Sequence, residues 1–152
     1  MLKTVHPLLN ADVLYALRQM GHGDDLIIAD TNFPAESIAR QTVFGRVLRI
    51  DADSATVARV VLSQYILDTF VDDAACRMEV VGKPDEVLPI HAEVQKEIDA
   101  AEGAGKFPLR GVERFAFYEK AKKAFAVIQT ADRRGYGCFS FKKGVILIDH
   151  KY

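Results

Sequence analysis

The chain has almost no net charge. Its 152 residues carry 20 basic and 21 acidic side chains, which gives a formal net charge of −1. So balanced a surface exerts no long-range attraction on nucleic acid or on anionic lipid. No uncharged stretch reaches the roughly 18–20 residues that a membrane span needs. Asn10 and Asp12 also interrupt the apolar core of any N-terminal signal. We therefore expect a soluble, cytoplasmic protein without a nucleic-acid or membrane partner.

The chain has only two cysteines. Cys76 and Cys138 lie far apart and form neither a CxxC pair nor a zinc-ligand spacing. A reducing compartment is the simpler interpretation of that usage. No linker, repeat or low-complexity tract divides the chain, so residues 1–152 are predicted to form one domain. A domain of this size buries roughly 68–70% of the surface of its unfolded chain, and it needs no disulfide or metal for stability.

The usual phosphate-binding loops are missing. The segment GHGD at 21–24 lacks the third glycine of GxGxxG and precedes its strand, and no P-loop sequence occurs. His22, Asp24 and Asp30 match no established metal-ligand spacing. We therefore expect neither a cofactor nor a metal.

Apolar periodicity and chain-breaking residues predict alternating strands and helices. Helices are expected at 11–20, 35–40, from Asp53 or Ser54, at 89–102 and at 112–124. Strands are expected at 26–29, 47–50, 76–81 and 124–130, with a closing hairpin of 139–141 and 145–148. The helix at 89–102 is expected to be mostly polar and solvated, and 103–111 to form turns. The alternation predicts an α/β fold, layered α/β/α, with a mostly parallel, mixed sheet of about six strands.

Two polar residues flank the predicted strand LIIA (26–29). His22 has two interpretations: it bonds the last free carbonyls of the preceding helix, or it acts as a general acid/base. Asp30 also has two. It is a helix cap or turn aspartate, or a ligand-binding carboxylate beyond the strand end, where α/β sheets bind ligands.

Two further segments contain residues suited to chemistry. Cys138 follows two arginines in RRGYGC, which could favour a thiolate, although a buried structural cysteine is the commoner case. The stretch RFAFYEKAKK at 114–123 interleaves aromatic and basic residues. At helical spacing this pattern indicates a core face backed by solvated lysines, but Arg114, Tyr118 and Lys122 could instead point together into a cleft.

Several blocks of the sequence occur in an order that is specific to one family. They are MLKT at 1–4, MGHGDDLIIAD at 20–30, RFAFYEKAKKAFAVIQT at 114–130, YG at 136–137 and FKKGV at 141–145. Together they resemble the RbsD/FucU family of sugar mutarotases, and the RFAFYE block is closest to the fucose branch. The resemblance covers nearly the whole chain.

The resemblance implies an isomerase that interconverts the α and β anomers of a free monosaccharide without a cofactor or metal. His22 corresponds to the catalytic histidine, and Asp30, Arg114 and Tyr136 correspond to sugar-contacting residues. Cys138 stands where the family usually has asparagine, and a thiol is a weaker donor and acceptor than an amide. The family also implies a homo-oligomer, a decamer, with sites near subunit boundaries.

The expected mechanism places the sugar beyond the strand end, where Asp30 fixes hydroxyls and His22 shuttles protons. Two other functions remain open at this point. The chain could be a sugar-binding protein accessory to uptake, without turnover, which the cysteine at position 138 favours. It could also be a thiol enzyme that depends on Cys138.

Overall fold

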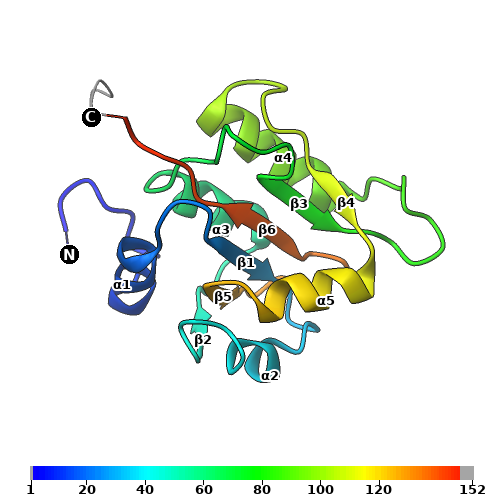
Figure 1. The fold of residues 1–152 in the computed structure, drawn as a ribbon, viewed down its shortest axis with the longest axis horizontal. Coiled ribbons are helices and arrows are strands. Elements are labelled where there is room, and N and C mark those ends of the chain that lie inside the picture. Colours follow the sequence, from blue (N-terminus) through cyan, green and yellow to red (C-terminus); the bar gives the residue numbers. More distant parts are fainter. Residues whose placement is uncertain (1, 148–152) are drawn as a thin grey trace.

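The computed structural model describes residues 2–147, and its centre is a six-stranded sheet (Figure 1). The strands are β1 (Asp25–Ala29), β2 (Val47–Arg49), β3 (Ala75–Met78), β4 (Arg110–Val112), β5 (Ala126–Gln129) and β6 (Phe139–Lys142). Their order across the sheet is β2-β5-β1-β6-β3-β4. Neighbouring strands are parallel except for β6, which runs antiparallel to both β1 and β3. All five parallel strands therefore end at the same side of the sheet, which we call the carboxyl edge; the opposite side is the amino edge.

Five helices cover the two faces of this sheet. They are α1 (Ala11–Gln19), α2 (Ala35–Ala39), α3 (Ser54–Leu62), α4 (Pro89–Glu102) and α5 (Arg114–Lys122). Buried side chains of α1, α3 and α4 form one core with one face of the sheet, and those of α2 and α5 form a second core with the other. The predicted α/β/α architecture with a mixed sheet is confirmed.

Strand β1 shows why both faces of the sheet are covered. Leu26 and Ile28 belong to the first core, whereas Ile27 and Ala29 belong to the second. Successive side chains of a strand point to opposite faces, so a continuous apolar run requires apolar cover on both sides. Burying each of the three large side chains contributes about 1.5–3 kcal/mol, and the prediction of a doubly buried strand at 26–29 is confirmed.

Local capping signals were also predicted well. Asn10 caps α1 by accepting a hydrogen bond from the Val13 amide, and Asp53 caps α3 by accepting one from the Thr56 amide. Both side chains satisfy amides that have no partner within the helix. These caps depend only on residues three positions apart, which is why the sequence reveals them.

Two predictions about the second half of the chain were wrong. Helix α4 is not mostly solvated, because Ile90, His91, Val94 and Ile98 are buried. The turn-rich segment at 103–111 ends in strand β4, which pairs with β3. Helix α5 has the core face that its pattern indicated, made by Phe117 and Ala121, while Phe115 is 62% exposed.

The closing hairpin does not form either. Residues 145–147 are in no strand, and Ile148 lies outside the described residues. After β6 the chain instead follows the segment before β3: Gly144 donates its amide proton to the Ile66 carbonyl at 2.7 Å, and Leu67 forms an isolated bridge with Lys143. The sheet is mixed because β6 is inserted between β1 and β3. The predicted third strand is also shorter than 76–81 because Val80 and Lys83 form a turn.

Candidate active site

Four of the five predicted site residues gather at the carboxyl edge. Asp30 follows β1, Cys138 directly precedes β6, Tyr136 lies in the loop before it, and Arg114 opens α5 just after β4. The pairing of Ile28 with Phe139 brings the residues before β6 next to Asp30. The Gly137 amide accordingly donates to the Asp30 Oδ2 at 2.9 Å. The structure thus joins segments more than 100 residues apart in the sequence.

Asp30 is buried and organises the loops around it. Its Oδ1 accepts hydrogen bonds from the amides of Asn32 (2.8 Å) and Phe33 (3.1 Å), and its Oδ2 faces Gly137 and the Cys138 thiol. Helix α2 begins only at Ala35, so Asp30 is a turn aspartate and not its N-cap. Because the same carboxylate bonds both loops, it holds the loop after β1 against the loop before β6.

Cys138 has the environment of a structural thiol. It is buried, and its Sγ lies 3.5 Å from the Asp30 Oδ2. Burial raises the pKa of the Cys138 thiol well above its ordinary value, and the Asp30 charge raises it further. Arg134, one of the two arginines that could have favoured a thiolate, instead pairs with Asp132 and Glu93. A thiol held protonated is a poor nucleophile, so the geometry argues against a thiol enzyme.

Arg114 has hydrogen-bonding capacity that the described residues leave unused. Its Nε is buried without a hydrogen-bond partner among residues 2–147. The guanidinium carbon lies 4.6 Å from the centre of the Phe115 ring, which orients the side chain by a cation–π contact. Planar guanidinium donors suit recognition of vicinal hydroxyls or carboxylates. Among residues 2–147, Arg114 therefore has a donor at this edge that no protein group uses.

Tyr136 is held in an uncommon conformation. Its φ of 59° lies in the left-handed region, which non-glycine residues adopt infrequently. Its carbonyl faces the Nε2 of the fully buried His91 at 3.0 Å, and the Leu88 amide donates to the His91 Nδ1 at 3.2 Å. Since Nδ1 accepts, Nε2 carries the proton and donates to Tyr136. His91 was missed by sequence reasoning, because helix α4 was taken as solvated.

The burial of His91 predicts a pH dependence of stability. Burial lowers the pKa of His91 below its ordinary value of 6.5, and the Arg77 charge acts in the same direction; the Tyr136 carbonyl and Glu86 oppose the shift. The unfolded state then binds more protons below pH 6.5, so the free energy of unfolding decreases as the pH falls through that range. Urea denaturation between about pH 7 and pH 5 measures this decrease. His91→Gln should flatten it, and an equal slope in that variant would contradict the assignment.

His22 lies at the opposite edge of the sheet. Its imidazole is 47% exposed, and its Nε2 lies 3.0 Å from the Oδ2 of the buried Asp68. Oδ1 of Asp68 accepts from the Phe70 amide at 3.0 Å, and the Phe70 ring meets the imidazole edge-on with 5.5 Å between ring centres. The side chain is thus held on one side by a carboxylate and an aromatic ring and is open on the other. Asp68 was also missed, because it lies 46 residues from His22 in the sequence.

Two expectations for His22 are corrected by this position. The last carbonyls near the end of α1 are not bonded by His22, because Lys143 Nζ donates to Leu17 and Met20 at 2.8 and 2.6 Å. His22 also does not meet Asp30 within one chain. The five residues of β1 lie between them, each adding about 3.3 Å. A single sugar cannot contact both side chains of the same chain.

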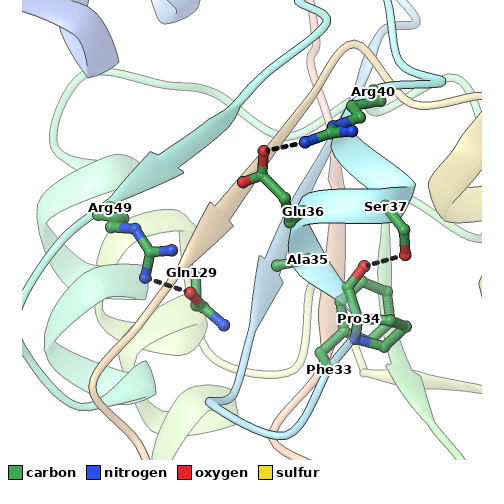
Figure 2. Close-up of a pocket in the computed structure, with 8 residues that line it drawn as sticks. All are labelled: Phe33, Pro34, Ala35, Glu36, Ser37, Arg40, Arg49 and Gln129. Carbon is green, nitrogen blue, oxygen red and sulfur yellow. Dashed lines mark hydrogen bonds and ion pairs between the residues drawn. The ribbon is translucent and has the colours of Figure 1, made fainter.

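A hollow of about 490 Å³ also opens at the carboxyl edge, beside β2 and β5 (Figure 2). Figure 2 shows Arg49 bonded to Gln129 on one wall, and an ion pair of Glu36 with Arg40 on helix α2. The hollow adjoins the predicted site through Phe33, in the loop that Asp30 anchors, but none of the four clustered residues lines it. It is a neighbour of the predicted site and not the site itself.

Two features are absent from residues 2–147. No three histidine, cysteine, aspartate or glutamate side chains there are grouped so that they could hold a metal ion. No helix in that range is long and apolar enough to cross a membrane.

The fold and the two clusters of residues define an α/β domain with polar groups at both ends of its parallel strands, and comparison with known proteins identifies the family. The chain belongs to the RbsD / FucU transport protein family, whose model matches residues 3–146. The predicted family is confirmed. A fucose mutarotase of Bos taurus is 41% identical over 151 residues, covering 95% of this chain and 94% of that protein.

Solved structures agree with this membership. The crystal structure of protein Atu2016 is 57% identical, with a TM-score of 0.93 and coverage of 97% of both chains. The fucose mutarotase of Streptococcus pneumoniae, solved in complex with L-fucose, is 30% identical with a TM-score of 0.85. That match covers 96% of this chain and all of the other.

Proposed function

We propose that this chain is a sugar mutarotase that interconverts the α and β anomers of L-fucose or a related free pyranose. The observation that carries the proposal is the half-exposed imidazole of His22, held by the buried Asp68, in a chain whose full-length relatives are fucose mutarotases. An imidazole fixed on one side and open on the other is suited to general acid/base catalysis.

The chemistry needs two proton transfers and no net change of atoms. The anomeric hydroxyl loses a proton, the bond between the anomeric carbon and the ring oxygen breaks, and the ring oxygen gains a proton. The open-chain aldehyde rotates, and the reverse steps close the ring on the other face. An ionised carboxylate only accepts hydrogen bonds, so Asp68 holds the proton of His22 on Nε2 and leaves a lone pair on Nδ1. That nitrogen is the base, and its conjugate acid then protonates the ring oxygen.

We infer that each site is completed by a second copy of the chain. His22 lies at the start of β1, whereas the cluster of Asp30, Arg114 and Tyr136 lies beyond its end. The catalytic half and the recognition half of one site can therefore meet only between two molecules. Phe70, beside His22, is 70% exposed, as expected for a contact surface. Closed homo-oligomers arise from repeated contacts of this kind. A decamer in the cytoplasm is the assembly and location that we propose.

Within the shared site the carboxyl edge recognises the sugar. Arg114 offers its Nε, unpaired among the described residues, and the hydroxyl of Tyr136, in the loop before β6, accepts from the Val81 amide of the loop after β3 at 3.4 Å. Asp30 contributes by position: its buried carboxylate accepts from amides of both loops and so holds the residues that face the sugar. Cys138 affects the sugar through Asp30, because its thiol occupies one side of the Asp30 carboxylate.

Exchange NMR on free sugars tests the proposal. The rate of anomer exchange is measured with and without protein for fucose, ribose, galactose and rhamnose. Faster exchange of fucose, with smaller effects on the others, is the expected result. Unchanged exchange for every sugar would reject a mutarotase. If calorimetry showed sugar binding at the same time, a binding protein without turnover would be selected instead.

Asp68→Asn should slow the catalysed exchange by about 10-fold or more, because an amide no longer holds the proton of His22 on Nε2 with the same strength. The pH profile of the exchange rate should shift as well, which a purely structural role would not cause. Asp72→Asn is a matched control in the same loop, since Asp72 is exposed and makes its contact through its backbone carbonyl. Equal rates in the two variants would show that Asp68 does not position His22.

A further inference from the structure

A groove on the α4 side of the sheet contains a buried cation without a counter-ion. Arg77 of β3 is only 6% exposed, and its Nη2 donates to the Pro84 carbonyl at 2.9 Å. Its Nη1 is buried and has no hydrogen-bond partner among residues 2–147. No carboxylate of those residues lies within 4.0 Å of the guanidinium. A buried guanidinium is costly unless an anion pairs with it, and buried unsatisfied groups are rare in native proteins.

Arg77 also lines a cavity large enough for a small molecule. The cavity measures about 410 Å³ and is lined by residues of α4, by Arg77 of β3 and by Leu109 just before β4. Helix α4 itself lies over the β3–β4 side of the sheet (Figure 1). Val87, Ala92 and Leu109 supply apolar walls, and Lys96 places a second cation at the rim. Volumes of this order, with apolar walls and few polar groups, are typical of ligand sites.

The other polar groups of the cavity are already engaged. The Gln95 amide donates to Asp99 and to the Phe107 carbonyl and accepts from the Leu109 amide. His91 uses both ring nitrogens on backbone groups. Asp99 also lines the cavity, and its carboxylate accepts from Gln95 and from the Gly105 amide. Arg77 and Lys96 place two positive charges against this one carboxylate, which favours a negatively charged ligand.

We propose that this groove binds a small organic anion, whose carboxylate or phosphate pairs with Arg77 and whose apolar body packs on Val87, Ala92 and Leu109. Guanidinium groups bind either head group through paired hydrogen bonds. The groove lies on the α4 face, separate from His22 and Arg114, so this site is independent of the proposed mutarotase activity. Its ligand would contact His91, whose ring bonds the Tyr136 carbonyl.

Methyl NMR of the intact protein tests the site with three probes: butyrate, butanol and inorganic phosphate. We expect butyrate to shift the methyl resonances of Val87 and Leu109, and butanol, which has the same apolar body without the charge, to leave them unchanged. Phosphate shifts in addition would extend the site to phosphate monoesters. No shift with any anion would overturn the proposal. The proposal would also be overturned if Arg77 paired with a carboxylate from a second copy of this chain.

Arg77→Met separates ligand binding from a structural role. Removing the buried guanidinium of the groove should weaken butyrate binding by about 10-fold or more, as expected for a charged hydrogen bond. The variant should fold, since an apolar chain replaces an unpaired buried cation. Arg49→Met, at the other end of the sheet, should bind butyrate normally. Equal affinity in both variants would overturn the proposal. If Arg77→Met does not fold, two other measurements test the site. Added salt should weaken butyrate binding to the unmodified protein, and Lys96→Ala should weaken it as well; unchanged affinity in both would overturn the proposal.

Discussion

Replacing His22 with glutamine should remove nearly all of the protein's acceleration of anomer exchange. Positioned acid/base catalysis contributes about 10²–10⁴-fold, and glutamine can hydrogen-bond but cannot carry a proton between two oxygens. The fold should survive, because the imidazole is 47% exposed and contacts mainly Asp68 and Phe70. Exchange NMR with fucose measures the loss directly.

The control for this variant is another exposed histidine. His6 bonds the Leu8 amide near the N-terminus and plays no part in either cluster. His6→Gln should therefore exchange fucose at the unmodified rate. Calorimetry should show that His22→Gln still binds fucose, because the proposed recognition groups belong to the carboxyl edge. Full acceleration in His22→Gln would end the proposed mechanism.

Co-assembly of two inactive variants should restore part of the anomer-exchange activity. His22→Gln removes the catalytic half of a site, and Arg114→Met removes the recognition half. If each site combines the amino edge of one chain with the carboxyl edge of another, random co-assembly gives about a quarter of the sites two intact halves. Exchange NMR on the co-expressed variants should recover that fraction of the unmodified rate.

The matched control combines two variants of the same half. Arg114→Met mixed with Tyr136→Phe leaves every carboxyl edge altered, so no arrangement of chains yields a complete site. That mixture should stay inactive, in contrast to the first. If the His22→Gln and Arg114→Met mixture also stays inactive while the assembled particles are intact, the site is not shared between chains.

Much of the fold could be predicted because the relevant interactions are local. The caps at Asn10 and Asp53 act over three residues, and the apolar run 26–29 shows its double burial by composition alone. The alternation of helices and strands then limits the fold class. The predictions of a solvated α4, of turns in place of β4 and of a strand at 145–147 were wrong because partners distant in the sequence decide these features. Strand β4 exists only because β3 is beside it, and 145–147 follow residues 66–68 instead of pairing as a hairpin.

The residues of the candidate site also fall into those that the sequence reveals and those that only distant contacts reveal. His22, Asp30, Arg114 and Tyr136 were found from sequence blocks. Asp68 and His91 were not, because nothing in their neighbouring residues marks them.

The sequence by itself determined the family, the α/β class and the residue types available for proton transfer and sugar recognition. Only the tertiary structure decided that these residues divide between two edges, with His22 held by Asp68 at one and the Asp30 loops at the other. The physical reason is the length of β1. Eight positions separate His22 from Asp30 in the chain, but an extended strand places them at opposite ends of the sheet.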